Sequence, residues 1–477
     1  MKERDLLMEG YKIILGYAPT TRGHWPLDAV TASEKAVRAR VNEIVEKLGD
    51  VELVDISEVA THGMIWNANE IQGIIDYLVA KKVDALFIPH CNFGEEEAVA
   101  KVAKGVNRPV LLWGPRDPEP EGELFRPYDS QCGMFASSKA LASYKVPFTY
   151  LENCWVDSPV LEKGLDAFVR VASVVKSMRG MRVGQLGVRP RPFLSMKINE
   201  SELLQKFGIE ITAVWPEEIQ SLTRKLLDES DPRIAERVEE IKAALDISAV
   251  GEEKVAAMAA IEIAVETIAK DQKLDAVAME CWRFTHTNFG VPSCFLLGDL
   301  IDRGLVAACE TDLHAAITAR MLQAAARGKS APFIADLTIR NPHNENSELL
   351  WHCGPFAKSL IKEGTKGAIK NGGKGFYELK GGDVTIARMD QIDGKYQIFA
   401  DYAVGCEGPK TNGNYLWVET NDWKQWEKKF MYGPYVHHMS CIHGDYTTII
   451  KEACKFINGL EHDSVNEIAD LFDKVSY

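Results

Sequence analysis

The sequence predicts an α/β protein in which two doubly wound domains are followed by a β-rich C-terminal domain. Short apolar runs alternate with helical patterns over the first third of the chain, and the same alternation restarts near residue 180. From about residue 364, glycines separate short alternating runs, which is typical of antiparallel strands and tight turns. Strands that alternate with helices imply a parallel sheet covered on both faces. We expect domains at residues 1–178, 179–355 and 356–477.

Four runs rich in Val, Ile or Leu predict the strands of the first domain: Ile13–Tyr17, Val51–Val54, Ala85–Pro89 and Val110–Trp113. The clearest helix between them is Thr31–Leu48, where Thr31 and Glu34 have the spacing of a capping box at the helix start.

In the second domain we expect five strands, at Met181–Gly187, Ile209–Val214, Ala276–Met279, Leu305–Cys309 and Pro332–Asp336. A polar stretch from Glu217 to about Lys270 has helical period, and helices are predicted at about Glu200–Phe207, Val291–Asp302 and Leu313–Ala326. In the third domain we expect strands at Val384–Ala387 and Tyr396–Ala400 and a helix at Thr447–Phe456.

The composition narrows the classes of function. The formal net charge of −14 argues against a nucleic-acid partner, because phosphate binding needs a basic face. No apolar run approaches the roughly 20 residues that span a membrane. The first ten residues contain no apolar signal core, so we expect a cytoplasmic protein. The ten cysteines are scattered without a CxxC pair, which indicates neither a zinc knuckle nor a disulfide framework.

Acidic residues follow three predicted strands of the second domain. Glu280 comes after Ala276–Met279, Glu310 comes after Leu305–Cys309, and Asp336 ends the strand that begins at Pro332. In open α/β sheets, ligands bind outside the carboxyl ends of the strands, so these side chains could converge on one point. Hard oxygen ligands of this kind suit Mg²⁺ or Mn²⁺. A carboxylate after a strand is also a common N-cap, and Asp312 is placed to cap the next helix.

Two histidine positions add to the predicted site. His352 lies in an apolar setting, and His437 and His438 are paired far from the acids in a chain with only 11 histidines. A lone buried histidine is more often a core residue than a ligand, but imidazole is a common partner of Mn²⁺ beside carboxylates.

These motifs, taken in order, resemble the L-fucose isomerase and L-arabinose isomerase superfamily. They are Cys309-Glu310-Thr311-Asp312, Phe333-Ile334-Ala335-Asp336, Leu350-Trp351-His352-Cys353-Gly354 and His437-His438. In that superfamily an acid in an Ala/Cys-Glu-x-Asp motif and a second acid some 25 residues later bind Mn²⁺; here the interval is 26 residues. The resemblance covers most of the chain and implies two Rossmann-like domains and a β-rich one.

The resemblance implies a metal set of Glu310, Asp336, His352 and His438, with His437 as the near alternative to His438. His352 depends on the arabinose isomerases alone, because fucose isomerases lack an obvious counterpart. The implied cofactor is Mn²⁺, with Mg²⁺ or Co²⁺ as alternatives. The implied activity is aldose–ketose isomerisation of a small sugar through a cis-enediol, with Glu310 and Asp336 moving the protons in an order that the sequence does not fix.

Further expectations follow from the same resemblance. Fucose isomerases use an N-terminal arginine for the substrate, which points to Arg22, with Trp25 beside it; an ordinary surface arginine is an equal alternative. His437 and Glu280 are further candidates for the substrate pocket, Glu280 acting through its neighbours. Family members form trimers or hexamers, so a homotrimer or homohexamer is expected.

Three rival functions can be compared with the sequence. A nucleotide-binding enzyme would need GxGxxG or GxxxxGK[ST] between a strand and a helix, and neither pattern is present. A non-catalytic sugar-binding protein of two lobes would not need Glu310, Asp336 and His438 together. Another metal-dependent sugar enzyme on the same scaffold, an epimerase or a lyase, is the rival that the sequence excludes least well.

Overall fold

The computed structural model describes residues 11–23, 25–119 and 126–476. By internal contacts the chain forms two units. Of the described residues, the N-terminal unit contains those from 11 to 176 together with 448–457 and 469–476, and the C-terminal unit contains residues 177–447 and 458–468. The three-domain division expected from the sequence stays a prediction. Among the described residues, no helix combines the length and the apolar character that crossing a membrane requires.

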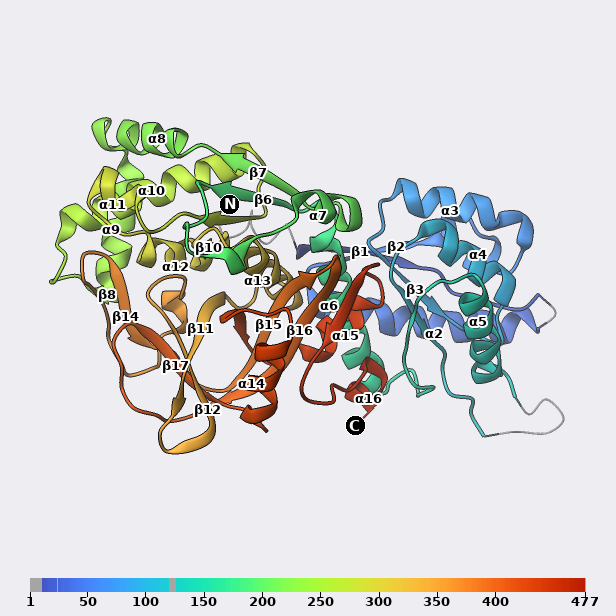
Figure 1. Ribbon diagram of the computed structural model, residues 1–477. Helices are drawn as coiled ribbons and strands as arrows, with labels where there is room; N and C mark the ends of the chain where they lie inside the picture. Colours follow the sequence, from blue (N-terminus) through green and yellow to red (C-terminus); the bar gives the residue numbers. More distant parts are fainter. Residues whose placement is uncertain (1–10, 24, 120–125, 477) are drawn as a thin grey trace. The chain divides into compact units, whose positions relative to one another are not determined.

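The N-terminal unit is built on a five-stranded parallel sheet with strand order β2-β1-β3-β4-β5. Strands β1, β2 and β3 are labelled in Figure 1. The four predicted strands are β1 to β4, and β5 is a short addition. Its strands are β1 Ile13–Tyr17, β2 Val51–Asp55, β3 Ala85–Pro89, β4 Val110–Trp113 and β5 Thr149–Tyr150. Its helices are α2 Leu27–Leu48, α3 Ile71–Ala80, α4 Glu96–Val106, α5 Ser130–Ser143, α6 Pro159–Met178 and α16 Leu471–Ser476, with short 3₁₀ turns at Ile56–Glu58, Thr61–Gly63 and Ala68–Glu70.

Helices cover both faces of this sheet because successive strand side chains point to opposite sides. On one face, Leu86 and Ile88 of β3 and Leu112 of β4 belong to one apolar cluster with buried residues of α3, α4 and α5. On the other face, Tyr17 of β1 donates a hydrogen bond to Glu34 of α2.

The predicted start of α2 is wrong. The helix begins at Leu27, with Pro26 at its N-cap, so Thr31 and Glu34 lie inside it and form no capping box. Proline has no N–H to donate, so it is tolerated at a helix start, where that N–H would have no partner within the helix, and the helix can begin directly after Pro26. Glu34 instead accepts hydrogen bonds from Tyr17 and Arg38.

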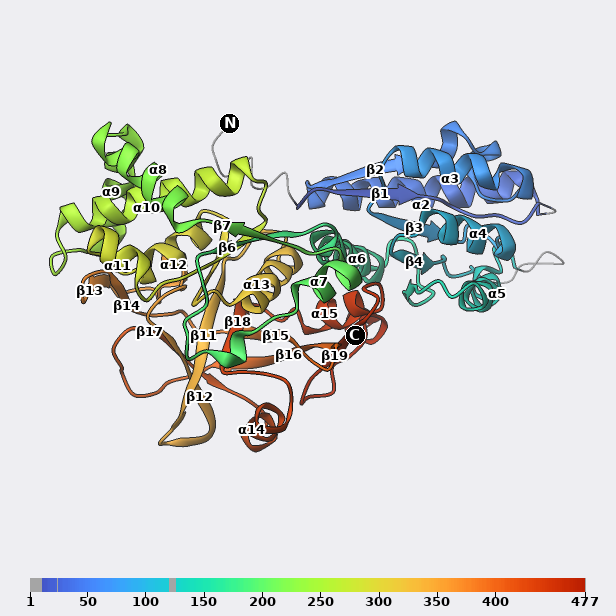
Figure 2. The ribbon, with the colours of Figure 1, turned by 45° about the horizontal axis from the view of Figure 1, so that its top comes forward.

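The C-terminal unit contains two sheets (Figure 2). The first is parallel, with strand order β10-β9-β6-β7, and consists of β6 Arg182–Leu186, β7 Glu210–Val214, β9 Ala276–Met279 and β10 Val306–Cys309. The helices that accompany it are α7 Glu200–Phe207, α8 Pro216–Asp228, α9 Pro232–Ala244, α10 Glu252–Asp271, α11 Phe284–Phe289, α12 Cys294–Asp302 and α13 Leu313–Ala325, with a 3₁₀ turn at Leu194–Met196. The long polar stretch predicted as helical is thus three helices, and Leu245–Asp246 within it forms a short strand, β8.

The second sheet is mixed and has ten strands in the order β19-β16-β15-β18-β11-β12-β17-β14-β13-β8. Its remaining strands are β11 Pro332–Asn341, β12 Asn344–His352, β13 Gly367–Lys370, β14 Lys374–Glu378, β15 Asp383–Ile392, β16 Lys395–Gly405, β17 Asn414–Glu419, β18 His438–His443 and β19 Leu460–Asp463. A 3₁₀ turn at Lys358–Leu360 and helix α14 Trp423–Tyr432 lie in its connections, and α15 Thr447–Cys454 follows β18. A mixed α/β fold with parallel sheets and a β-rich C-terminal sheet is confirmed, while the Rossmann-like detail stays a prediction.

One predicted strand belongs to a different sheet from the one expected. Pro332–Asp336 was expected as a strand of the second parallel domain, with Asp336 at its carboxyl end. Instead β11 continues to Asn341 and pairs antiparallel with β12 and β18. The cause is the hairpin partner β12, which begins three residues after β11 ends and extends it past Asp336. Asp336 therefore lies in the middle of a strand.

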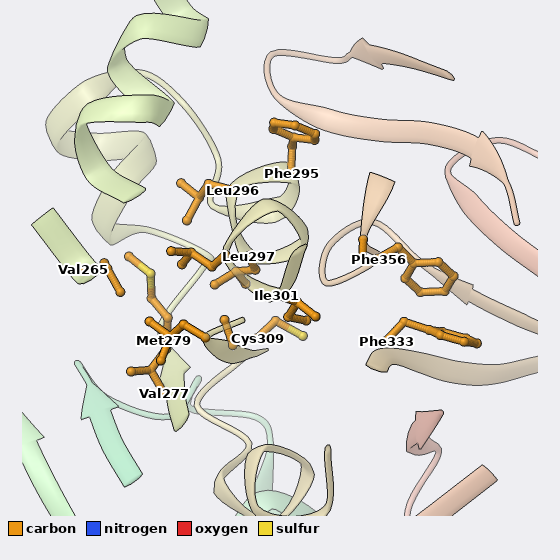
Figure 3. Close-up of a cluster of buried hydrophobic side chains, with 14 of the residues drawn as sticks. Val265, Val277, Met279, Phe295, Leu296, Leu297, Ile301, Cys309, Phe333 and Phe356 are labelled. Carbon is orange, nitrogen blue, oxygen red and sulfur yellow. The ribbon is translucent and has the colours of Figure 1, made fainter. Parts of the chain in front are cut away.

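Helix α13 joins the two sheets of the C-terminal unit. In both views it lies between the parallel sheet and the ten-stranded sheet (Figures 1 and 2), and all of its residues from Leu313 to Ala325 are buried. Beside it, α12 packs its apolar side chains against β9, β10 and the segment around Phe356 (Figure 3). At Gly298 of α12 an added Cβ would lie 2.2 Å from the carbonyl oxygen of Phe356, so glycine is what permits this close approach.

Candidate functional site

The turn between β10 and α13 has an unusual backbone. Glu310 and Thr311 both have φ of 56°, a left-handed conformation that is uncommon outside glycine and a clear outlier for β-branched threonine. Such residues cost on the order of 1 kcal/mol each and persist only where their surroundings hold them, often at functional sites. The turn ends at Asp312, which accepts a hydrogen bond from the amide of Ala315 and so forms the N-cap that the sequence suggested. The strain marks Glu310 as a residue whose position matters.

Strand pairing brings the second acid to the late histidine. Asp336 of β11 lies directly opposite His438, the first residue of β18. On its other side Asp336 lies opposite Trp351 of β12, the residue before His352. Residues directly opposite each other on antiparallel strands have neighbouring side chains. The ladder therefore gathers three predicted ligands that are up to 102 residues apart in the sequence.

The four predicted metal ligands form one cluster. His438 Nε2 lies 3.1 Å from Glu310 Oε2 and 3.4 Å from Asp336 Oδ1. His352 Nε2 lies 3.8 Å from Asp336 Oδ1. Both histidines are buried, whereas the carboxylates keep 13% and 19% of their side-chain surface exposed. The site is thus open on the side of the acids.

The donor set fits a divalent metal ion. Asp336 Oδ1 is buried and has no hydrogen-bond partner within the part of the chain that the structure describes. A buried carboxylate oxygen without a partner is costly unless an ion or a ligand group satisfies it. Two groups with metal-ligand spacing meet here, Asp336 with His437 and His438, and Glu310 with Cys309 and His352. Carboxylate oxygens with imidazole nitrogens are suited to Mn²⁺ more than to Ca²⁺.

A buried ion network orients His438. Its Nδ1 lies 2.9 Å from Asp312 Oδ2, and the same oxygen lies 2.5 Å from a guanidinium nitrogen of Arg388. Burial raises the pKa of Asp312, but Arg388 and His438 outweigh it and hold that pKa well below its usual range. A permanently ionised Asp312 keeps the proton of a neutral His438 on Nδ1. In that neutral ring the lone pair of Nε2 faces Glu310 and Asp336, as a metal ligand requires. Burial lowers the pKa of His438, but hydrogen bonds with Asp312 and Glu310 outweigh it and raise the pKa to about 9, so without an ion the charged ring donates from Nε2 to Glu310.

His352 has the opposite arrangement. Its Nδ1 accepts a hydrogen bond of 3.0 Å from the amide of Gly354, so a neutral ring has its proton on Nε2. Nε2 then donates to Cys309 Sγ at 3.2 Å, while Asp336 Oδ1, at 3.8 Å, lies beyond hydrogen-bond distance. Burial lowers the pKa of His352, but Asp336 and Cys353 together outweigh this and the net pKa is raised. This geometry favours a hydrogen-bond donor, and the predicted ligand role of His352 stays a prediction.

Of the other predicted residues, two lie beside the cluster. His437 is exposed, and its ring centroid is 4.5 Å from that of His438. The carboxylate of Glu280 accepts three backbone hydrogen bonds, from the amides of Trp282, Arg283 and Phe284, at 2.8–3.0 Å. Glu280 therefore orders the turn after β9.

Arg22 and Trp25 belong to the N-terminal unit, where both contact Phe93. The Arg22 guanidinium carbon lies 3.8 Å above the centre of the Phe93 ring, and its Nε donates to the carbonyl of Gly94. Trp25 donates from its indole nitrogen to the carbonyl of Pro127. Arg22 and Trp25, after β1, are thus each held by a hydrogen bond and a ring contact.

Sequence reasoning missed several residues of this site. Asp312 was recognised only as a helix cap, although its place in the Glu-x-Asp motif was a signal for a second role. Trp282 donates a hydrogen bond from its indole nitrogen to Glu310 Oε1 at 2.9 Å, and its place two residues after Glu280 was the available signal. Arg388 had no signal, because only folding brings it to Asp312.

Two sequence comparisons find similarity to sugar isomerases. A sequence model described as "Fucose/sulfoquinovose isomerase, N-terminal domain" matches residues 16–179, about a third of the chain. A protein named sulfoquinovose isomerase from Priestia aryabhattai is 27% identical over 409 residues, which covers 84% of this chain and 90% of that protein. A protein of the same name from Alkalicoccus urumqiensis is 25% identical and covers 80% of this chain and 86% of its own length.

Solved structures offer only distant similarity. A solute-binding protein from Actinobacillus succinogenes with bound D-allose is 14% identical, covers 56% of this chain and 78% of its own, and gives a TM-score of 0.18. A score this low supports no inference about fold or function.

Proposed function

Since the chain is a fucose isomerase-like protein, we propose that it is a Mn²⁺-dependent isomerase that interconverts an aldose and a ketose. The observation that supports this most is that Glu310, Asp336 and His438 lie together. One oxygen of Asp336, Oδ1, is buried there and has no hydrogen-bond partner among the described residues. Mg²⁺ and Co²⁺ are the alternative ions.

Glu310, Asp336 and His438 would hold the metal, and His352 would either complete the set or donate a hydrogen bond beside it. When bound, a divalent ion supplies a Lewis acid that stabilises negative charge on substrate oxygens. The contact of Asp312 with Nδ1 of His438 keeps Nε2 of that ring facing Glu310 and Asp336. The rings of His352 and His438 are both buried.

Isomerisation moves one proton between C1 and C2 of the open-chain sugar and another between the two oxygens, through a cis-enediol. Glu310 and Asp336 would take these two roles, one as base at carbon and the other as acid and base at oxygen. Burial raises the pKa of Glu310, but hydrogen bonds from His438 and Trp282 outweigh it and the net pKa is lowered. Glu310 is therefore ionised at neutral pH and available to accept a proton.

The relatives named sulfoquinovose isomerase make a sulfonated sugar the first substrate to test. We propose a panel of this sulfonated hexose, a 6-deoxyhexose and a pentose, incubated with the protein and Mn²⁺ and followed by NMR. Formation of the ketose supports the proposal, whereas epimers or fragments would identify the rival metal enzyme. Binding without turnover across the panel would contradict it.

Two substitutions test the assigned residues. Glu310→Gln and Asp336→Asn should each nearly abolish turnover while the protein stays folded, because each removes a ligand and a proton acceptor. Exhaustive chelation with EDTA should abolish activity, and added Mn²⁺ should restore it. Full activity of a well-folded Glu310→Gln variant would refute the assignment.

The proposal also includes a substrate contact by the N-terminal unit and an assembly of several identical chains. Arg22, with Trp25 beside it, would contact the substrate, so Arg22→Lys should raise KM more than it lowers kcat if its planar guanidinium is what binds. The expected homotrimer or homohexamer is measured by light scattering coupled to size-exclusion chromatography.

A further inference from the structure

A large aromatic side chain lies half exposed against the acid that the proposed reaction needs. Trp282 keeps 50% of its surface accessible, and its indole Nε1 donates a hydrogen bond of 2.9 Å to Glu310 Oε1. Exposed tryptophans are usually free to reorient, and this one is fixed at its polar edge. A hydrogen bond to an ionised carboxylate is among the stronger ones in proteins.

The main chain that presents Trp282 is itself held in place. The Glu280 carboxylate accepts hydrogen bonds from the amides of Trp282, Arg283 and Phe284, so the turn after β9 is tied to the last residue before it. The side chain of Trp282 is therefore projected from an ordered turn.

Phe193, from the segment between β6 and α7, supports the ring from one side. Its ring centroid lies 5.2 Å from that of Trp282 at an interplanar angle of 80°, and 6.2 Å from that of His438 at 74°. Edge-to-face contacts of this kind are favourable for aromatic pairs. One phenylalanine thus touches both Trp282 and the histidine that faces the acids.

The two oxygens of Glu310 consequently have different partners. Oε1 is bound by Trp282, and Oε2 faces His438 Nε2 at 3.1 Å. Without a donor at Oε1 the carboxylate could rotate about its last bond, and Glu310 itself has a left-handed backbone conformation with φ of 56°.

We propose that Trp282 is a positioning residue, whose indole N–H fixes the carboxylate of Glu310 in its reactive orientation while its half-exposed ring presents an apolar face to the sugar. The proposal rests on the proposed function, because it assumes that Glu310 takes part in the reaction. It adds a separate prediction, that the N–H group acts on kcat and the ring acts on KM.

Two variants separate these contributions. Trp282→Phe keeps an aromatic ring and removes the donor, while Trp282→Gln removes the ring and keeps an N–H donor at the same number of bonds from Cβ. We expect Trp282→Phe to lower kcat about tenfold with little change in KM, because a hydrogen bond to a charged group is lost. Trp282→Gln should keep more of kcat and raise KM, since the apolar face is lost.

A measurement without substrate supports the same assignment. Titration with Mn²⁺ alone should quench part of the tryptophan fluorescence of the unsubstituted protein, and Trp282→Phe should lose that part. Trp155→Phe is the matched control, because Trp155 is exposed to a similar extent, 47%, and lies in the N-terminal unit. It should keep both the quenching and the activity.

The outcomes distinguish this proposal from the proposed function. Wild-type kcat in Trp282→Phe, or an equal loss of kcat in the Phe and Gln variants, would overturn the positioning role even if Glu310→Gln is inactive. Full activity of Glu310→Gln would instead remove the proposed function on which it depends.

Discussion

Replacing Asp312 by asparagine tests whether the buried network, and not the helix cap alone, builds the site. Asparagine is as good an N-cap as aspartate, so the hydrogen bond from the Ala315 amide is retained. The negative charge shared by His438 and Arg388 is lost. Truncating one partner of a buried ion pair typically costs about 3–5 kcal/mol.

The structure places the expected loss at the lower end of that range. Arg388 also lies 3.0 Å from Asp390 Oδ2, so its charge keeps one partner in the variant. We therefore expect Asp312→Asn to lower the free energy of unfolding of the C-terminal unit by about 3 kcal/mol. His438 would lose the acceptor that fixes its tautomer, and Mn²⁺ affinity should fall by about 10- to 100-fold.

Urea denaturation and Mn²⁺ titration calorimetry measure the two effects. Asp422→Asn is the matched control, since Asp422 caps α14 through the Gln425 amide in an exposed position. The pKa of Asp312 is depressed in the folded state, so its stabilisation is complete above the unfolded pKa near 3.8 and is lost as pH falls below it. Burial lowers the pKa of His438, but Asp312 and Glu310 outweigh it and raise the pKa to about 9, so the difference between the variant and the wild type should shrink as pH rises from about 6.5 toward 9. Wild-type Mn²⁺ affinity and an unchanged midpoint in Asp312→Asn would refute the reasoning.

Other predictions concern His352, Glu348 and Gly298. His352→Gln keeps a donor at the position of Nε2 and should change the affinity for Mn²⁺ by less than about tenfold. His438→Gln should lower that affinity by more than about 100-fold. Equal losses of Mn²⁺ affinity in the two variants, measured by calorimetry, would make His352 a ligand. Burial and Glu427 raise the pKa of Glu348 to about 8, against the pull of Arg340, so the folded state loses stability as pH rises from 4.5 toward that value. Glu348→Gln should therefore stabilise the protein at about pH 8.5, by no more than about 5 kcal/mol, and have almost no effect near pH 4.5. A gain independent of pH in urea denaturation would contradict this. Gly298→Ala should destabilise the C-terminal unit by more than about 2 kcal/mol, as its Cβ would meet the Phe356 carbonyl, and an unchanged urea midpoint would show that the contact can relax.

The sequence alone determined the local parts of this protein. The strands β1, β3, β4 and β9 end where their apolar runs end, because a buried parallel strand needs a continuous apolar sequence. Glu310, Asp336 and His438 were predicted as ligands by motif, a role that stays a prediction, and Asp312 was predicted as an N-cap, which the structure confirms. These features depend on neighbours within a few residues, which is why a linear pattern reveals them.

Tertiary structure decided how these parts meet. Asp336 was expected at the end of a parallel strand, but it lies in the middle of β11, and its approach to His438 comes from the antiparallel ladder with β18. Arg388 reaches Asp312 across 76 residues, and Trp282 reaches Glu310 across 28. Such contacts depend on strand pairing and on helix α13, which is fully buried between two sheets. The free energy of folding that fixes these elements comes from packing between residues far apart in the sequence. The sequence therefore predicted which residues would come together, and only the fold decided which oxygen and which nitrogen face one another.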